Sequence, residues 1–498
     1  MPDDLFSFLS TVTNPSRPFL RVPGRTAFSF GQGFGWAGKF AHVLVAHGVA
    51  PGDRVAVQVE KSPENLFLYL ACLRAGAVYL PLNPAYTAGE LTHLLGDSEP
   101  RIFICSPEKQ KMAQGIFSGD ILTLSDNGSG TLMEQAQAQS PAFANVPREA
   151  RDLAAILYTS GTTGKPKGAM LSHGNLASNA QALKQEWRFS ENDVLLHALP
   201  IFHTHGLFVA TNVSLASGAT IILLPKFDLN EIFKALPDAT TMMGVPTFYT
   251  RLLSDPRLTK TAVKHIRLFI SGSAPLLAET HDEWKARTGH EILERYGMTE
   301  TNMNTSNPFA GPRKPGTVGL PLPGSEIRIT DDKGAQLATH DVGRILVRGP
   351  NVFSGYWGQP ERRAADFTAD GFFITGDMGK LDEDGFLTIV GREKDLVITG
   401  GLNVYPKEVE TLLDAIPGVS ESAVFGVAHP DFGEGVTAAL TLRPGAGLTE
   451  AQIIAALQNR LASFKIPKRV MILNEIPRNT LGKVQKNLLR EQFKDLYK

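Results

Sequence analysis

One polar run constrains this chain more than any other stretch, because it separates two apolar segments. Residues 158–168 read Tyr-Thr-Ser-Gly-Thr-Thr-Gly-Lys-Pro-Lys-Gly. An apolar segment at 153–157 precedes the run. Apolar side chains at alternating spacings of four and three residues follow it, at Leu176, Ala180, Leu183 and Trp187. This order predicts a strand, a polar loop and then a helix.

The composition of the run suits a phosphate ligand. Glycines let successive backbone N–H groups converge on an anion, hydroxyls add donors, and lysine supplies a mobile positive charge. The G-x-x-x-x-G-K-[ST] spacing of the P-loop is absent, and the same residue types also build ordinary turns. The run is therefore a candidate phosphate cradle. Its candidate residues are Thr159, Ser160, Gly161, Thr162, Thr163, Gly164, Lys165, Lys167 and Gly168.

Bulk properties exclude several classes of protein. A net charge of −1 without a long basic run gives no indication of a nucleic-acid or membrane-surface partner. No stretch of about twenty apolar residues predicts a transmembrane span. The two cysteines, Cys72 and Cys105, offer neither a disulfide framework nor a metal cluster. The first residues lack the features of a presequence, so we expect a cytoplasmic protein.

The length of 498 residues predicts at least two domains. Residues 53–80 have the pattern of a strand, a helix and a strand, and further apolar strands lie at 219–224 and 267–270. This alternation predicts parallel sheets covered by helices. After residue 394 the remaining hundred or so residues suit a small α+β domain. In it we expect helices at 405–416, 449–463 and 481–497 and strands at 422–427 and 437–442. The expected domains are therefore 1–393 and 394–498.

Five motifs occur in an order that is known from one superfamily. They are residues 158–168, Tyr296-Gly-Met-Thr-Glu300, Thr375-Gly-Asp377, Gly391-Arg-Glu-Lys-Asp395 and Pro477-Arg-Asn-Thr-Leu-Gly-Lys483. With them, nearly the whole chain resembles the adenylate-forming superfamily of acyl-CoA synthetases, firefly luciferase and peptide-synthetase adenylation domains. The resemblance implies an α/β fold. It comprises a large N-terminal domain of helix-covered mixed and parallel sheets with a β-barrel-like subdomain, and a small mobile α+β C-terminal domain. It further implies ATP, Mg²⁺ and CoA as reaction partners. We expect a monomer or a weak homo-oligomer.

The resemblance also implies roles around ATP. The 158–168 loop would hold the β- and γ-phosphates, Thr299 would contact the α-phosphate, and Glu300 would help to hold Mg²⁺. Tyr296 would stack on adenine, Asp377 would accept from both ribose hydroxyls, and Arg392 would reach the ribose or a phosphate. The expected lining of the adenine slot is Ser273, Ala274, Pro275, Glu294, Arg295, Tyr296, Gly297 and Met298.

Three features of the C-terminal part imply a two-step reaction. Lys483 matches the catalytic lysine, which stabilises charge between the α-phosphate and the acyl oxygens. Lys394 matches the hinge about which the small domain swings after adenylation. Gly400, Gly401 and Leu402 would then face the pantetheine of CoA.

Two arginines bear on the acid that is activated. Arg251 lies in an otherwise apolar helical pattern and Arg295 precedes the Tyr296 motif. Each could pair with a protein acid such as Glu294. A guanidinium can instead grip a second carboxylate with a two-pronged fork, whereas a fatty-acid pocket would not favour it. His203 matches a gate position near the reacting carboxylate, and Thr204 and Met303 are candidates for the wall beside C2 of the acid.

These features resemble malonyl-CoA synthetases in particular. We therefore expect conversion of malonate, ATP and CoA to malonyl-CoA, AMP and pyrophosphate, with a methyl group on C2 as a tolerated variation. Two enzymatic alternatives remain open. One is a CoA ligase for a short- or medium-chain or aryl monocarboxylate, and the other is a free-standing adenylation module that loads a carrier protein. A catalytically inactive nucleotide-binding protein is the alternative outside enzymes.

Overall fold

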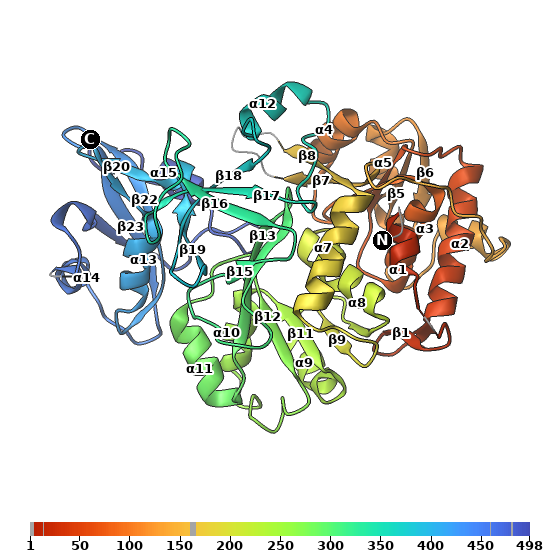
Figure 1. Ribbon diagram of the computed structural model, residues 1–498, viewed down its shortest axis with the longest axis horizontal. Helices are drawn as coiled ribbons and strands as arrows, with labels where there is room; N and C mark the ends of the chain where they lie inside the picture. The colour runs from red at the N-terminus through yellow and green to blue at the C-terminus, as the bar shows by residue number, and fades with distance from the viewer. Residues whose placement is uncertain (1–3, 13, 160–165, 459, 480–481) are drawn as a thin grey trace.

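The computed structural model describes residues 4–12, 14–159, 166–458, 460–479 and 482–498. These residues form four sheets, which Figure 1 shows as a large N-terminal body on the right and a small C-terminal domain, in blue, on the left. None of the helices in these ranges has the length and apolar content that a membrane span requires.

The first sheet has six strands in the order β6 (Asp120–Thr123), β5 (Ile102–Cys105), β3 (Arg54–Gln58), β4 (Val78–Pro81), β7 (Leu153–Thr159) and β8 (Lys167–Ser172). β8 is antiparallel to β7, and the other pairings are parallel. The expected strand, helix and strand of residues 53–80 are confirmed as β3, α3 (Pro63–Ala75) and β4. The Ser62 hydroxyl caps α3 and Gly76 ends it in the left-handed region, as their residue types predict.

The second sheet has nine strands in the order β15 (Leu320–Pro321), β14 (Asn302–Ser306), β13 (Ile292–Met298), β12 (Leu268–Ser271), β11 (Thr241–Gly244), β9 (Val194–His197), β10 (Thr220–Leu223), β1 (Pro18–Arg21) and β2 (Phe28–Ser29). The six strands from β13 to β1 are parallel, and antiparallel strands lie at both edges. Helix α7 (His173–Glu186) contributes to two hydrophobic cores. Leu176 packs in the core that includes strands of the first sheet, and Leu183 packs in a core of the second sheet.

The other helices of the large body are α1 (Leu5–Leu9), α2 (Phe30–Ala46), α4 (Ala88–Ser98), α5 (Gln110–Ile116), α6 (Thr131–Gln137), α8 (Asn212–Ser217), α9 (Leu229–Ala235), α10 (Pro246–Leu253), α11 (Ala278–Thr288) and α12 (Arg363–Asp366). A π-helical turn, His205–Thr211, leads into α8.

The third sheet is antiparallel, in the order β16 (Glu326–Thr330), β17 (Gly343–Arg348), β18 (Phe373–Leu381) and β19 (Leu387–Arg392). It occupies the place of the expected β-barrel-like subdomain. Within the described residues β16 and β19 do not pair with each other, so this sheet is open. Four strands are too few to close a barrel around a filled interior.

The small domain contains β20 (Val397–Thr399), β21 (Leu402–Val404), β22 (Val419–His429), β23 (Gly433–Leu442), β24 (Arg469–Ile472), α13 (Pro406–Asp414), α14 (Glu450–Leu457) and α15 (Lys486–Gln492). The expected strands and the first helix are confirmed. The last two helices are shorter than expected. α14 ends at Leu457, and α15 begins only at Lys486, because the described residues Asn479, Gly482 and Lys483 hydrogen-bond to one another in a pattern that is not helical.

The expected passage from strand to loop to helix around residues 158–168 also needs correction. After the loop the chain first returns as strand β8, and only then enters α7. Residues 168–171 are Gly-Ala-Met-Leu, which suits a strand buried against β7. Lys167 and Gly168 therefore lie on the strand rather than in the loop.

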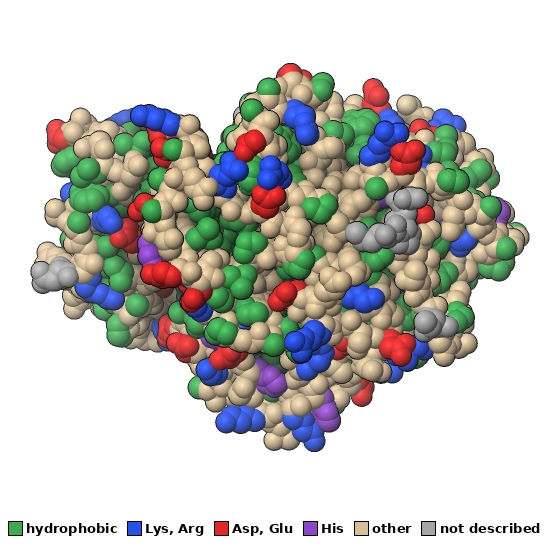
Figure 2. Space-filling view, in the orientation of Figure 1, with side chains coloured by type: hydrophobic (Ala, Val, Ile, Leu, Met, Phe, Trp, Pro, Cys, Tyr) green, Lys and Arg blue, Asp and Glu red, His purple; other side chains and the backbone are tan. Residues whose placement is uncertain are grey.

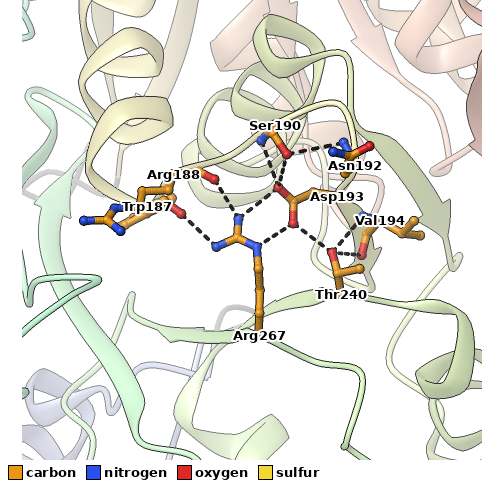
Figure 3. A network of polar contacts seen from close by, with 8 residues as sticks. All are labelled: Trp187, Arg188, Ser190, Asn192, Asp193, Val194, Thr240 and Arg267. Carbon is orange, nitrogen blue, oxygen red and sulfur yellow. Dashed lines mark hydrogen bonds and ion pairs between the residues drawn. The ribbon is translucent and has the colours of Figure 1, made fainter.

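One polar network fixes the amino ends of three neighbouring strands in the second sheet (Figure 3). The Arg267 guanidinium, just before β12, donates to both carboxylate oxygens of Asp193, just before β9, at 2.6 and 2.9 Å. Its other N–H groups donate to the carbonyls of Trp187 and Arg188, and Thr240, before β11, donates to Asp193. This cluster is structural and lies at the amino ends of the strands. Ligands bind such sheets at the opposite, carboxyl ends.

The N-terminal helix α1 is held to the large body by a buried histidine. The Leu5 backbone N–H donates to Nδ1 of His173 at 3.1 Å, and the His173 side chain is fully buried. Burial lowers the pKa of His173 to about 4. The imidazole is therefore neutral in the folded protein, with Nδ1 free to accept.

The stability of the large body should fall with acid through this residue. The unfolded chain takes up a proton on His173 as the pH falls below about 6.5, whereas the folded chain does so only near pH 4, so stability is lost across that window. We expect His173→Gln to reduce the loss of unfolding free energy between pH 7.5 and pH 5 by roughly 2 kcal/mol. Urea unfolding at the two pH values measures it. The exposed His93→Gln is the control, and an equal acid loss in wild type and His173→Gln would contradict the assignment.

Candidate active site

The site lies at the carboxyl ends of β9, β12 and β13. Residues 198–206 follow β9, residues 272–275 follow β12, and residues 294–300 form the end of β13 and its turn. Parallel strands present their carboxyl ends at one edge of a sheet, which is where ligands bind in such folds. The sequence motifs from distant parts of the chain therefore converge here.

Arg295 is the most unusual residue of the site. Its side chain is only 4% exposed, and among the described residues neither Nε nor Nη2 has a hydrogen-bond partner. Burial lowers the pKa of Arg295 to about 9. The expected alternative partner, Glu294, accepts instead from the Gly316 backbone N–H at 3.4 Å. Successive residues of a strand point to opposite faces, so these two neighbours on β13 do not meet.

Two histidines share the surroundings of Arg295. Burial, the Lys483 ammonium and the Arg295 guanidinium lower the pKa of His203 to about 3. Burial, followed by the charge of Arg295, holds the pKa of His205 well below its usual range. Both imidazoles are therefore neutral, because a further positive charge would be repelled. In the described part of the chain the buried hydroxyls of Thr204 and Ser271 and Nε2 of His205 also lack partners.

Unpaired buried donors carry a free-energy cost, and several of them around one cation indicate a missing anion. Ser273 adds strain, since its φ of +70° is rare for a residue with a side chain, and its hydroxyl lies 3.2 Å from Nδ1 of His205. Such features gather where a ligand completes the structure.

Two glycines permit the close packing of this site, and neither role was evident from sequence. A Cβ atom on Gly272 would lie 2.3 Å from the central carbon of the Arg295 guanidinium, so a side chain at this position would displace the guanidinium. A Cβ atom on Gly297 would lie 1.9 Å from the Asn302 carbonyl oxygen and 2.5 Å from Cε of Met303. Met303 is buried in the core beside this turn.

Lys61 is a further residue whose role was not evident from sequence. Its ammonium lies 3.0 Å from Nδ1 of His197 and donates to the carbonyls of His197 and Leu199, each at 2.8 Å. Nε2 of His197 lies 2.9 Å from the Gly206 carbonyl oxygen. Lys61 thus holds the start of the segment that carries His203 and Thr204, and His197 connects this start to the end of the segment at Gly206. A lysine before an N-cap serine gives no sequence signal for this long-range contact.

Three residues meet at the expected ribose site, where Tyr296 and Asp377 are buried and Arg392 is half-buried. The Tyr296 hydroxyl donates to Oδ2 of Asp377 at 2.5 Å, and Nε of Arg392 lies 2.7 Å from Oδ1. The Asp377 carboxylate raises the pKa of Arg392. The Tyr296 ring packs with Ile345 and Val347 of the third sheet. Both carboxylate oxygens of Asp377 are therefore oriented by neighbours before any nucleotide is bound.

Glu300 forms a separate anionic centre. Its carboxylate is buried and accepts from the Tyr356 hydroxyl at 2.9 Å and from Thr159 at 3.5 Å. Within the described ranges no lysine, arginine or histidine nitrogen lies within 4.0 Å of it. Lys167 is nearby, with Nζ over the Tyr356 ring at 5.2 Å, and its pKa is lowered mainly by burial. No group of three metal-ligating side chains occurs in the described part of the chain. A single unpaired carboxylate suits a cation whose other ligands come from phosphates.

Lys483 reaches the large body from the small domain. Burial and the Arg392 guanidinium lower the pKa of Lys483, whereas Asp377 and Glu300 act in the opposite direction. The residue as a whole is exposed, while its ammonium lies among charged groups of the large body. Figure 2 shows the furrow between the two bodies on one face of the molecule.

The structure does not bring Arg251 to this site. Arg251 is exposed, and its guanidinium lies over the Phe227 ring at 5.8 Å. Its helical neighbour Tyr249 is the buried one, with its hydroxyl on the Ile270 carbonyl. Two residues correspond to about 200° around a helix, so the two side chains point to opposite sides. The expectation that both arginines line the acid pocket is therefore corrected to Arg295 alone.

The remaining expected residues lie as follows. Thr299, Ala274 and Met298 are partly exposed, and Pro275 is exposed. Gly400, Gly401 and Leu402 lie at the exposed tip of the β20–β21 hairpin, where φ of +57° and +77° requires the two glycines. Lys394 is exposed in a short helical turn, Glu393–Asp395, between the third sheet and the small domain. The phosphate-cradle residues Ser160, Gly161, Thr162, Thr163, Gly164 and Lys165 lie outside the described residues.

Comparison with known proteins agrees with this geometry. A family profile described as "AMP-binding enzyme" matches residues 10–357, and one described as "AMP-binding enzyme C-terminal domain" matches residues 408–483. The chain is similar to the crystal structure of ATP-bound MatB from Rhodopseudomonas palustris, at 56% identity and a TM-score of 0.98 with all of both chains covered. The apo structure of MatB, at the same identity and coverage, gives a TM-score of 0.87.

Sequence relatives act on different acids. The malonate–CoA ligase of Arabidopsis thaliana is 33% identical over 484 residues, which are 90% of this chain and 79% of that protein. The feruloyl-CoA synthase of an Amycolatopsis species is 34% identical over 474 residues, 94% of this chain and 95% of that protein. Similarity at this level therefore does not choose the acid, and the site residues must do so.

The unpaired charge of Arg295 should lower the stability of the protein without ligands. Replacing a buried cation that has no partner by an apolar side chain of similar length removes a desolvation cost. We expect Arg295→Met to raise the free energy of unfolding by about 1–3 kcal/mol in ligand-free buffer. Urea unfolding measures it, and the exposed Arg251→Met is the matched control, with little change. A destabilised Arg295→Met would mean that the guanidinium has a partner within the chain.

Proposed function

This chain belongs to the AMP-binding enzyme family, and we propose that it is an acid–thiol ligase that converts malonate, ATP and CoA to malonyl-CoA, AMP and pyrophosphate. The reaction runs through a malonyl-AMP intermediate. The structural observation on which malonate rests is the buried guanidinium of Arg295 beside the expected reaction centre, where Nε and Nη2 lack partners among the described residues. The malonate–CoA ligase among the relatives supports the same substrate.

Malonate carries one carboxylate to react and a second to be recognised. Arg295 can hold the second with two parallel N–H···O bonds, and the free hydroxyl of Thr204 and Nε2 of His205 can donate or accept beside it. A monocarboxylate would enter the same pocket and leave the guanidinium unpaired. A site built on buried polar groups rejects an analogue that lacks the matching group by a large factor.

In the first half-reaction an oxygen of the reacting carboxylate attacks the α-phosphorus of ATP. A P–O bond forms, and the bond to the bridging oxygen breaks, which releases pyrophosphate. The 158–168 loop would hold the leaving phosphates and Thr299 the α-phosphate. Lys483 would place its ammonium between the α-phosphate and the acyl oxygens, where negative charge accumulates. Neutral His203 contributes no charge and would shape the entrance for the carboxylate.

The nucleotide would bind between the large-domain motifs. The paired oxygens of Asp377 would accept from the two ribose hydroxyls, with Tyr296 and Arg392 holding the carboxylate in place. Glu300 would ligate Mg²⁺, whose preference for oxygen ligands suits an unpaired carboxylate next to phosphates. The metal ion would neutralise phosphate charge there.

In the second half-reaction the CoA thiolate attacks the acyl carbon, and AMP leaves. The small domain would turn about Lys394, withdraw Lys483 and bring Gly400, Gly401 and Leu402 to the pantetheine. The two left-handed glycines suit a close backbone approach. Residues 1–393 and 394–498 are the units that would move relative to each other.

The alternatives are separated by substrate. A monocarboxylate CoA ligase has no use for the unpaired Arg295, and a carrier-protein loading module would release AMP faster with a carrier protein than with CoA. An inactive nucleotide-binding protein would release no pyrophosphate. A pyrophosphate assay across acetate, malonate, methylmalonate, succinate and benzoate distinguishes them, and a best rate with acetate would contradict malonate.

Arg295 should decide the preference among acids. We expect Arg295→Met to lower kcat/KM for malonate by about a hundredfold or more, while acetate and butyrate rates change little, because only malonate loses a carboxylate partner. Steady-state AMP release with each acid measures the effect.

The matched control is Arg251→Met, which removes an exposed guanidinium from a neighbouring helix and should leave all the rates unchanged. An equal loss for malonate and acetate in Arg295→Met would point to a general role in catalysis or folding. That result would contradict the assignment of Arg295 to the second carboxylate.

A further inference from the structure

The described residues on either side of positions 480–481 pair with each other as the two arms of a small hairpin, one of which carries Lys483. Arg478 and Val484 form an isolated antiparallel bridge. The Lys483 backbone N–H donates to the Asn479 side-chain oxygen, and the Asn479 backbone N–H donates to the Lys483 carbonyl, each at 2.9 Å. The hairpin closes where the Gln485 N–H donates to the Pro477 carbonyl at 2.8 Å. Among the described residues these bonds, and not a helix, precede α15, whereas the sequence predicted a helix over 481–497.

The Arg478 side chain spans this hairpin. Its Nη1 donates to the carbonyl of Gly482, the residue directly before Lys483, at 2.6 Å. Its Nη2 contacts Oε2 of Glu421 on strand β22. One planar guanidinium therefore links the sheet of the small domain to the peptide bond that leads into Lys483. Lysine could not make both bonds with the same fixed geometry.

We propose that Arg478 is a positioning residue for Lys483, held by Glu421, and that it acts on adenylation and not on thioester formation. The inference rests on the proposed AMP-forming reaction, whichever acid is used. The Lys483 ammonium lies among the charges of Arg392, Asp377 and Glu300 in the large body. Because the side chain is long, a small rotation of its backbone moves the ammonium by a larger distance. Misplacement of a catalytic group by about 1 Å can cost roughly a hundredfold in rate.

The CoA-facing hairpin should not depend on Arg478. The sheet order is β21, β20, β23, β22, so Glu421 on β22 and the Gly400–Gly401 tip between β20 and β21 lie at opposite edges of the sheet. The stability of the domain should depend little on the pair either. The Arg478 and Glu421 side chains are 33% and 31% exposed, and pairs of this kind contribute little to folding.

The test measures the two half-reactions separately in the full-length protein. Pyrophosphate release in one turnover, with ATP and malonate but without CoA, reports adenylation. Formation of malonyl-CoA from synthetic malonyl-AMP and CoA reports the second step. We expect Arg478→Met to slow the first about ten- to a hundredfold and to leave the second within about twofold of wild type. Glu421→Gln should give a smaller loss of the same kind, and the double variant should be no slower than Arg478→Met.

The control is Arg469→Met, which breaks a comparable pair in the same domain, between Arg469 of β24 and Glu450 of α14, 3.0 Å apart. Both of its half-reactions should be unchanged. If Arg478→Met does not yield folded protein, Arg478→Lys must show the same selective loss. Unchanged adenylation, or an equal loss in both steps, would overturn the inference. Absence of pyrophosphate release in wild type with every acid would instead overturn the proposed function.

Discussion

A buried positive charge without a partner is the constraint around which the rest of this site is arranged. Arg295 lies on a strand of the second sheet, with a glycine opposite its guanidinium and two neutral histidines nearby. A protein pays a real desolvation cost for such a charge, and the cost persists only where a ligand compensates it. The surrounding hydroxyl and imidazole groups that lack partners in the described chain extend the same pattern. A dicarboxylate is then preferred because its second carboxylate supplies the negative charge that the Arg295 guanidinium lacks.

The amino ends of the strands in the second sheet carry a structural ion pair, whereas their carboxyl ends carry the candidate active site. At the amino ends, Arg267 and Asp193 form a bidentate contact, so each of these two charges has its partner within the protein. At the carboxyl ends, among the described residues, neither Arg295 nor Glu300 forms an ion pair within 4.0 Å. The small domain then supplies one further charge, Lys483, which lies among residues of the large body. In this arrangement the chain superposes more closely on ATP-bound MatB than on its apo form, with TM-scores of 0.98 and 0.87.

The sequence predicted much of this molecule, and the failures have physical reasons. Helix α3 followed from a serine cap, a first-turn proline and a terminal glycine, which are local signals. Arg251 was identified because it lies in an apolar helical pattern, and Arg295 because it precedes the Tyr296 motif. Only the direction of each side chain separates them, and helix phase places Arg251 outside. Lys61 and Gly272 act through contacts with residues far away in the chain, so no local pattern could reveal them. The short final helix reflects a hairpin whose bonds involve side chains rather than a periodic pattern.

The central claim is that Arg295 receives the second carboxylate of the substrate. A crystal structure with a non-hydrolysable malonyl-adenylate analogue tests it most directly. The account predicts that both oxygens of the free carboxylate lie within about 3.2 Å of Arg295 nitrogen atoms, with the Lys483 ammonium beside the linkage to the phosphate. A free carboxylate that points into solvent or toward another cation, with Arg295 still unpaired, would contradict it.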